Sequence, residues 1–186
     1  MNRSLITVLT IACMMLLSSC VAPGSIVEIR TKTFHRLTQA PKGQKFVVLA
    51  TDAEKNQDLE FMTHAARTSI YFKDLGNTMI KPGEKPDFIV YLSYSVVQAG
   101  YGYYRRELQM TIVDRSPQRS AGTDTPLYQG NALSVGSSSS SAQIIPILID
   151  GLMRDFPSKM GTTNEYSYPS EFVELVYQRN DPALAR

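Results

Sequence analysis

The 186-residue sequence has few of the side chains that usually build metal and catalytic centres. It contains two histidines, His35 and His64, which stand 29 positions apart, and two cysteines, Cys13 and Cys20. These residues form no recognisable set of zinc ligands, and the acidic residues do not follow the spacing of a calcium-binding loop. We therefore expect the protein to use no metal and no other cofactor.

The sequence also lacks an excess of charge of one sign. Nineteen Lys and Arg residues face 17 Asp and Glu residues, so the formal net charge is +2. Proteins that bind nucleic acid usually present a broad basic surface to the phosphate backbone, so we expect no nucleic acid as a partner. The apolar fraction of 43% is typical of a globular chain and not of a disordered one.

The apolar run of residues 5–17 is too short to span a membrane, since it has 13 residues and a span needs about 20. A short basic start precedes it and small residues follow, which is typical of a secretory signal peptide. The segment Leu17-Ser18-Ser19-Cys20 resembles the bacterial lipobox, in which Leu and two small residues precede Cys. The resemblance implies that residues 1–19 are removed and that Cys20 then carries acyl chains. An ordinary signal peptide followed by a chance cysteine is the alternative.

The same resemblance accounts for both cysteines. Cys13 would leave with the signal peptide and Cys20 would carry lipid, so the mature fold would hold no disulfide and no thiol. Residues 20–25 would form a tether whose five extended residues after the cysteine reach roughly 17 Å, which keeps the domain close to its bilayer. Val21 stands where lipoproteins retained in the inner membrane carry Asp. For a Gram-negative host, the pattern resembles that of lipoproteins sorted to the periplasmic face of the outer membrane; a Gram-positive host is the alternative.

Alternation of apolar and polar residues predicts the strands. It indicates half-buried strands over residues 26–37 and 87–97, an antiparallel partner through Leu108, Met110 and Ile112, and a last strand over residues 127–135. Residues 78–80 can begin a further strand. Residues 46–50 are apolar without alternation, which predicts a central strand covered on both faces. We expect the side chains of Phe88, Val90, Leu92 and Ile112 to face the helices.

Helical periodicity predicts one helix from Leu59 to a C-terminal cap at Gly76. Its start is marked by a capping box at Thr51 and Glu54, by Asn56 or by Asp58. The expected apolar stripe is Leu59, Met62, Ala66 and Ile70, widened by Phe61, Ala65 and Phe72. His64 falls near the edge of this stripe, where we expect a solvated or core-edge histidine.

A second helix is predicted after residues 137–141, which form a serine-rich connection with Ser141 as the N-cap. Its apolar stripe is Ile145, Leu148, Ile149, Leu152 and Phe156. Pro146 fits only near a first turn, so the helix should begin late, and Pro157 should end it.

The resulting order predicts an α+β fold in which a single mixed sheet of four or five strands carries two helices on one face. The domain covers residues 26–157, and in the C-terminal extension of residues 158–186 we expect Phe172, Val173, Leu175 and Val176 to pack on it. With the lipobox, Leu75-Gly76 and Lys85-Pro86-Asp87-Phe88-Ile89-Val90 resemble a family of uncharacterised bacterial lipoproteins built on one domain of unknown function. The element order is more distantly similar to the lipopolysaccharide-assembly lipoproteins of the outer-membrane translocon. These resemblances imply a fold and a compartment, and no substrate.

The sequence contains no complete catalytic motif. Ala132-Leu133-Ser134-Val135-Gly136 lacks the first glycine of a nucleophile elbow, and both histidines precede the serine that a triad histidine should follow. Gly100 and Gly102 lack the third glycine of a dinucleotide fingerprint and lead into a strand where a helix is required. We expect a non-enzymatic binding or scaffolding module. The alternatives are an envelope hydrolase that uses Ser134 or an acidic residue, and a surface-displayed adhesive lipoprotein.

The candidate binding residues lie at the predicted hairpin tip of residues 100–106. They are Tyr101, Tyr103, Tyr104, Arg105 and Arg106. Tyr and Arg are enriched in binding hot spots, and Arg pairs with phosphate and carboxylate groups. The hairpin could thus contact an envelope protein, lipopolysaccharide or peptidoglycan, while the acyl chains on Cys20 contact the membrane. The alternative interpretation is that the tyrosines cover a sheet edge and the arginines keep the hairpin soluble.

The lipobox generates a direct prediction. Cys20→Ala should block lipidation, because the acyl chains have no sulfur to join, and should leave the protein unprocessed or released. Membrane fractionation and the size of the mature chain measure this. A Cys20→Ala protein that fractionates with the membrane at the mature size would contradict the lipobox assignment.

Overall fold

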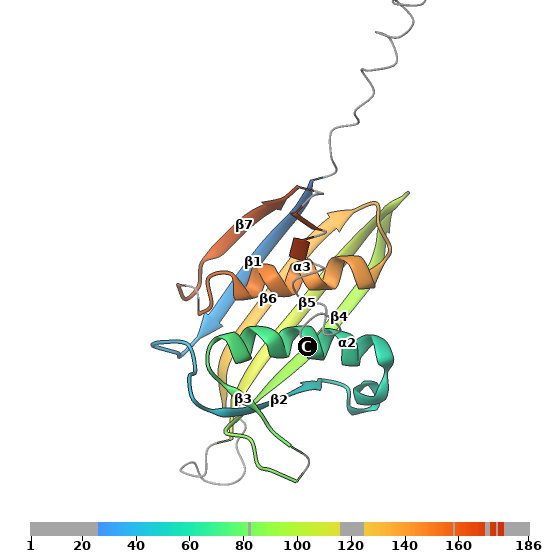
Figure 1. Cartoon of the computed structure of the whole chain (residues 1–186). Helices are drawn as coiled ribbons and strands as arrows, with labels where there is room; N and C mark the ends of the chain where they lie inside the picture. Colours follow the sequence, from blue (N-terminus) through green and yellow to red (C-terminus); the bar gives the residue numbers. More distant parts are fainter. Residues whose placement is uncertain are drawn as a thin grey trace, which may run out of the picture.

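The computed structural model describes residues 26–81, 83–115, 125–157, 159–169, 172–173 and 175–176. Within them, one seven-stranded sheet carries two α-helices on one of its faces (Figure 1). The strands are β1 (Val27–His35), β2 (Lys45–Ala50), β3 (Thr78–Met79), β4 (Phe88–Gly100), β5 (Tyr103–Asp114), β6 (Pro126–Gly136) and β7 (Thr163–Tyr168). The helices are the 3-10 helix η1 (Ala53–Gln57), α2 (Leu59–Asp74) and α3 (Ser141–Met153).

The sheet is mixed, and its strand order is β3-β2-β4-β5-β6-β1-β7. β2 runs parallel to β3 and β4, with Phe46 opposite Phe88, and the other neighbours are antiparallel. The predicted mixed sheet and the predicted antiparallel partner of residues 87–97 are therefore confirmed. Tyr101 and Gly102 join β4 to β5, and Gly102 has a φ of +73°, a left-handed conformation that glycine adopts without a steric penalty.

The prediction of four or five strands is wrong, because the described sheet has seven. The strand that the sequence pattern missed entirely is β7, which pairs with β1 at one edge of the sheet. Its side chains on the helix face include Asn164, Tyr166 and Tyr168, so β7 alternates between two sets of polar or hydroxyl-bearing residues. A search for alternating apolar residues finds little in such a strand.

The prediction that residues 46–50 form a central strand is also wrong. β2 lies second from the edge, beside the two-residue β3, and its buried residues alternate. Phe46, Val48 and Ala50 are buried on the helix face, whereas Val47 and Leu49 are half-buried on the other face. The outward side chains of β2 are apolar although they are only partly covered. The sequence of β2 therefore shows no apolar–polar alternation, even though the strand is not central.

α2 begins after Asp58, whose carboxylate accepts the backbone N–H of Glu60 at 2.9 Å. Among the predicted starts of this helix, Asp58 is therefore the N-cap. Asp52 caps the preceding η1 in the same way, by accepting the N–H of Glu54 at 3.2 Å. The helix ends at Asp74, and the predicted capping glycine, Gly76, follows with a φ of +86°.

The predicted apolar stripe of α2 is wrong at its N-terminal half. Leu59 is 80% exposed and Met62 is 51% exposed. The buried face instead consists of Phe61, His64, Arg67, Thr68, Ser69, Tyr71 and Phe72. The large aromatic rings contribute more buried area than Leu59 and Met62 would, so their positions decide how the helix is rotated against the sheet.

α3 begins at Ser141, earlier than Pro146 had predicted, and Ser140 in place of Ser141 is its N-cap. Pro146 therefore lies inside the helix, where it has no N–H to donate to the carbonyl of Ala142. Every side chain from Ile144 to Met153 is buried, and this burial offsets the missing bond. The helix ends at Met153, before the predicted stop at Pro157.

Both helices share one hydrophobic core with the inner face of the sheet. The ring of Phe72 lies 5.4 Å from Phe46 and 5.7 Å from Phe88, centroid to centroid, and Phe156 contacts both Phe72 and Tyr128. The predicted inward residues Phe88, Val90, Leu92 and Ile112 are all buried, so this part of the prediction is confirmed.

The C-terminal segment packs in part. Val176 is buried and Val173 is half-buried, as predicted, whereas Phe172 and Leu175 are exposed. In the part of the chain that the structure describes, no helix combines the length and the hydropathy needed to cross a membrane.

The core assignment predicts the effect of a charge at Leu92. Leu92→Asp should abolish cooperative thermal unfolding, because a buried unpaired charge costs more than about 4 kcal/mol against a total stability of about 5–15 kcal/mol. Ser93→Asp is the matched control, since Ser93 points to the opposite face and is half-buried. Circular dichroism melting measures both variants. Equal melting temperatures would place Leu92 outside the core.

Candidate functional site

The structure divides the five predicted binding residues between the two faces of the sheet. The turn itself consists of Tyr101 and Gly102, and β5 begins at Tyr103, so the predicted tip of residues 100–106 is too long. Tyr101 is fully exposed and Tyr103 is 58% exposed. The alternation of β5 then turns Arg105 outward, whereas Tyr104 is half-buried and Arg106 is buried on the helix face.

The outward residues of the hairpin form a continuous surface with two valines. Val97 pairs with Arg105, and Arg105 pairs with Val135, so the three side chains form one row across β4, β5 and β6. Both valines are more than half exposed. We call the residues Val97, Tyr101, Tyr103, Arg105 and Val135 the tip surface. It combines apolar and aromatic groups with a single cation.

The cation of the tip surface is paired. Arg105 Nη2 donates to Glu107 Oε2 at 3.1 Å. The amide of Asn131 donates to the other carboxylate oxygen, and this hydrogen bond is the main cause of a lowered pKa for Glu107, to which Arg105 adds. Glu107 thus stays ionised at neutral pH, and the Arg105–Glu107 pair carries no net charge. The tip surface is accordingly close to neutral.

Arg106 ties the strands together from the buried side. Its guanidinium donates to Ser134 Oγ at 3.1 Å and to the carbonyl of Ser138 at 3.2 Å, and burial lowers the pKa of Arg106. A Cβ at Gly136 would lie 2.5 Å from Arg106 Nη2, so a larger residue there would displace the guanidinium from this position. The prediction that Arg106 belongs to an exposed binding site is therefore wrong.

The same hydrogen bonds define the surroundings of Ser134, which would be the nucleophile if the protein were a hydrolase. Ser134 is buried, and its hydroxyl oxygen accepts a hydrogen bond from the Arg106 guanidinium. A guanidinium has donors only and cannot take a proton from a serine, so this partner does not activate the hydroxyl.

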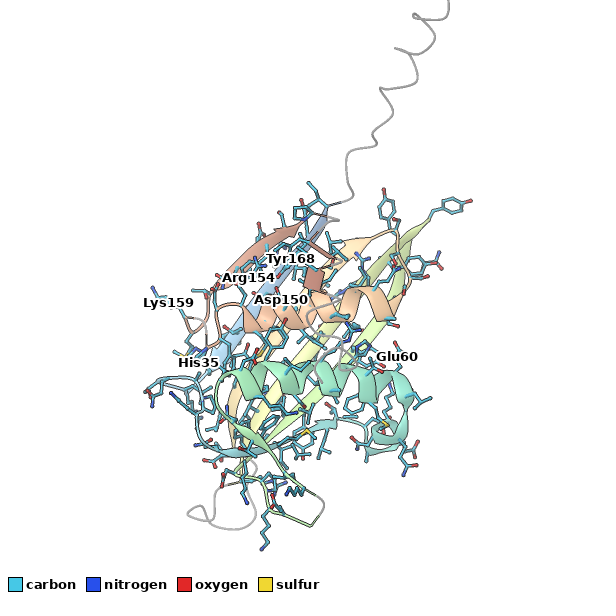
Figure 2. The ribbon with its side chains drawn as sticks, in the orientation of Figure 1. His35, Glu60, Asp150, Arg154, Lys159 and Tyr168 are labelled. Carbon is cyan, nitrogen blue, oxygen red and sulfur yellow. The ribbon has the colours of Figure 1, made fainter. Side chains whose placement is uncertain are left out.

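A second polar cluster joins α2, β4 and α3. His64 is 2% exposed, which corrects the expectation of a solvated or core-edge histidine. Its Nε2 lies 3.7 Å from Glu60 Oε1, and its ring meets that of Tyr94 edge-on at 5.1 Å between centroids. Glu60, labelled in Figure 2, also accepts a hydrogen bond from the hydroxyl of Ser141 at the start of α3. Residues 60 and 141 are far apart in the chain, so no local sequence pattern could have revealed the cluster.

Burial sets the titration of this cluster. It lowers the pKa of His64, against the opposing effect of the Glu60 carboxylate, and the nearby Arg67 lowers the pKa further. Burial also raises the pKa of Tyr94 to about 12, with Glu60 and Asp58 adding to the shift. At neutral pH the rings of His64 and Tyr94 are therefore both uncharged.

A third cluster surrounds Asp150, where Figure 2 shows Asp150, Arg154 and Tyr168 together. The hydroxyls of Tyr71 and Tyr168 each donate to a different Asp150 oxygen at 2.8 Å, and Arg154 Nη2 lies 3.3 Å from the carboxylate. The Arg154 guanidinium also lies over the ring of Tyr168 at 4.6 Å. Burial, followed by the charge of Asp150, raises the pKa of Tyr168. The carboxylate is fully engaged by α2, α3 and β7, which assigns it to the scaffold.

The outer face of the sheet carries a groove beside the tip surface. Its volume is about 290 Å³, and its lining includes Glu28, Arg30, Val135, Glu165 and Ser167. Arg30 and Glu165 form an exposed ion pair at 2.8 Å across it. Among the described residues no group of three or more His, Cys, Asp and Glu side chains could hold a metal ion. Cys20 lies outside the described residues.

No protein-family model matches the chain, and no curated protein matches its sequence. Among solved structures, a PDZ domain protein from Parabacteroides distasonis ATCC 8503 is similar over 84% of this chain and 42% of its own, at 11% identity and a TM-score of 0.50. The chain thus spans less than half of that protein, and the likeness concerns the fold alone.

Two further solved structures are more distant. A PelC dodecamer from Paraburkholderia phytofirmans has 12% identity, covers 66% of this chain and 95% of its own, and gives a TM-score of 0.44. A protein from Caulobacter crescentus CB15, provisionally described as a lipoprotein, has 11% identity, covers 75% and 90%, and gives a TM-score of 0.29. The resemblance to a lipoprotein family drawn from the sequence motifs stays a prediction.

The buried His64 predicts a pH dependence of stability. Its pKa is lowered from the usual 6.5 in the folded protein, so the unfolded chain binds the proton more readily. The stabilisation is therefore fully present above pH 6.5 and is lost as the pH falls toward the folded-state pKa.

Melting temperatures at about pH 7.5 and about pH 5.5 test this, on either side of the usual histidine range. The midpoint should fall at the lower pH, and His64→Gln should reduce that fall. His35→Gln, which replaces the only other histidine, is the control, and in this variant the melting temperature should still fall at the lower pH. An equal fall in the wild type and in His64→Gln would assign the effect to the acidic residues.

Proposed function

We propose that the protein is a lipid-anchored envelope protein whose domain acts as a non-enzymatic binding or scaffolding module. The single observation that carries this proposal is the tip surface, which presents Tyr101 fully exposed at the end of a long hairpin. Tyr101 and Tyr103 contribute little to the core, so the fold gives no structural reason for two tyrosines there. Exposed tyrosines on a rigid hairpin are suited to binding.

The anchoring half of the proposal is supported by Leu17-Ser18-Ser19-Cys20 and by the apolar run before it. Val21, in the place of the inner-membrane retention residue, favours the periplasmic face of the outer membrane. Lipidation with more than one acyl chain gives stable anchoring, because each buried CH₂ contributes about 0.8 kcal/mol. The acyl chains on Cys20 would be the membrane contact, and the domain would act within the reach of the tether.

The binding half rests on the chemistry of the tip surface. Its two tyrosines and two valines supply contact area, and the Arg105–Glu107 pair supplies polar groups without net charge. Candidate partners are an envelope protein, lipopolysaccharide or peptidoglycan. The partner of Ser134 is a guanidinium, which favours binding over the envelope hydrolase. Surface display of an adhesive lipoprotein is the other alternative, and protease accessibility on intact cells distinguishes it.

A crosslinked pull-down of the native lipoprotein tests the tip surface. Tyr101→Ser, Tyr103→Ser and Arg105→Ser together should abolish the crosslinks to the envelope component, because they remove the large exposed side chains. The melting temperature should change little, since all three residues are exposed.

The matched control is Lys32→Ser with Phe34→Ser, which removes an exposed cation and an exposed ring from the same outer face near its other end. This variant should retain the crosslinks. If the triple variant retained binding, Tyr101, Tyr103 and Arg105 would not be binding residues. Specific labelling of Ser134 by a serine-reactive phosphonate would overturn the non-enzymatic proposal in favour of the hydrolase.

A further inference from the structure

The tip surface lies at the same end of the sheet as the start of the described chain. Tyr104 pairs with Gly136, and continuing the β1–β6 register from the Arg30–Leu133 pair places Val27 opposite Gly136. Val27, Gly136 and Tyr104 therefore share one row across β1, β6 and β5. Figure 1 shows the beginning of β1 and the end of the β4–β5 hairpin at the same end of the sheet.

The hairpin projects past this row in the direction from which the chain enters. Gly102 and Tyr103 extend two residues beyond Tyr104, which corresponds to roughly 7 Å at about 3.4 Å per residue. β5 is separated from β1 by two strand spacings, or roughly 10 Å. Ile26 is six positions after Cys20, and six extended steps of the chain span roughly 20 Å. A lipid on Cys20 thus brings the bilayer within reach of the tip.

The exposed side chains at this end suit a bilayer surface. Ile26 is exposed at the entry of β1, and the alternation of β1 places it on the outer face with Val97, Tyr103 and Val135. Tyr is enriched at the membrane–water interface because its ring is apolar and its hydroxyl can bond to water and headgroups.

The opposite end of the same outer face has another character. A groove there is lined by Lys32, Phe34, Gln109, Gln129 and Asn131 among others, so amide and ammonium groups surround a single ring. Among the described residues, the exposed tyrosines and valines are Val97, Tyr101, Tyr103 and Val135, and all four lie at the tether end.

The expected contact is weak by itself, and the anchor makes it effective. Two tyrosines, two valines and an isoleucine bury little area, so a free domain would bind a bilayer poorly. A short flexible linker gives the second contact an effective concentration in the millimolar range, which is enough to populate a weak interaction. The Arg105–Glu107 pair adds no net charge, so anionic lipid is not required.

We propose that the tip surface, with Ile26, rests in the headgroup layer of the bilayer that holds the acyl chains of Cys20. This inference rests on the lipid anchoring proposed above and names the lipid surface as the partner of the same site. The two contacts, one through the tether and one through the hairpin, hold the strands at a steep angle to the membrane. The far end of the outer face, with the groove lined by Lys32 and Phe34, then stands clear of the bilayer.

A single indole tests the proposal, because the chain contains no tryptophan. Tyr101→Trp places the fluorophore at a fully exposed position, and Phe34→Trp places it on the outer face near the other end of β1. Val27 and Phe34 are seven residues apart, which corresponds to roughly 24 Å along the strand. Each lipidated variant is reconstituted into phosphatidylethanolamine and phosphatidylglycerol vesicles, with or without phosphatidylcholine brominated near the headgroup end of its acyl chains.

Binding to the vesicles should shift the emission of the indole at position 101 to the blue, and the bromolipid should quench it severalfold. The indole at position 34 should show neither change. In the Tyr101→Trp background, adding Val97→Ser, Tyr103→Ser and Val135→Ser should weaken the quenching.

Flotation of the vesicles reports anchoring separately. Protein that floats without quenching at position 101 overturns the lipid contact and leaves the anchoring intact. Protein that does not float overturns both. Equal quenching at the two positions overturns the assignment of the contact to the tip surface.

Discussion

The structure depends on the one-sided cover of its sheet. Because α2 and α3 lie on the same face, the position of each residue along a strand decides whether its side chain enters the core or faces outward. In β5 this rule separates neighbours of the same type: Arg105 lies outside with Glu107, and Arg106 lies inside with Ser134. A run of tyrosine and arginine that looks uniform in the sequence thus serves two purposes. One half forms an exposed surface, and the other half fastens β5 to β6 and to the serine-rich connection.

The sequence predicted the fold where one face of an element is plainly apolar. Phe88, Val90 and Leu92 recur at every second position, so the position of β4 and its inward residues could be derived before the structure. β7 escaped because its helix-facing positions carry Asn164, Tyr166 and Tyr168, whose burial depends on hydrogen-bond partners elsewhere in the chain. The rotation of α2 could not be derived for a related reason. The helix offers two overlapping stripes, and only the sheet beneath it selects the aromatic one.

The candidate site was predictable in part. The sequence placed Tyr101, Tyr103 and Arg105 together, and the structure confirms that they share a surface. The sequence did not indicate that Val97 and Val135 belong to the same surface, because strand pairing alone brings these two valines beside Arg105. The buried polar clusters illustrate the same limit more strongly, since Asp150 is bound by residues 79 and 18 positions away. Polar groups so deep in a fold need partners, but the sequence does not say which residues supply them.

The placement of β1 between β6 and β7 has a consequence for how the chain matures. β1 is the first strand, yet its neighbours come from the far end of the sequence, and the Arg30–Glu165 contact spans 135 positions. Closing so large a loop is slow, because chain entropy is lost long before the pairing stabilises the product. The first strand therefore has no partner on either edge until β6 has emerged, and its second edge stays open until β7 follows. A polypeptide whose topology delays its own completion stays unfolded for longer.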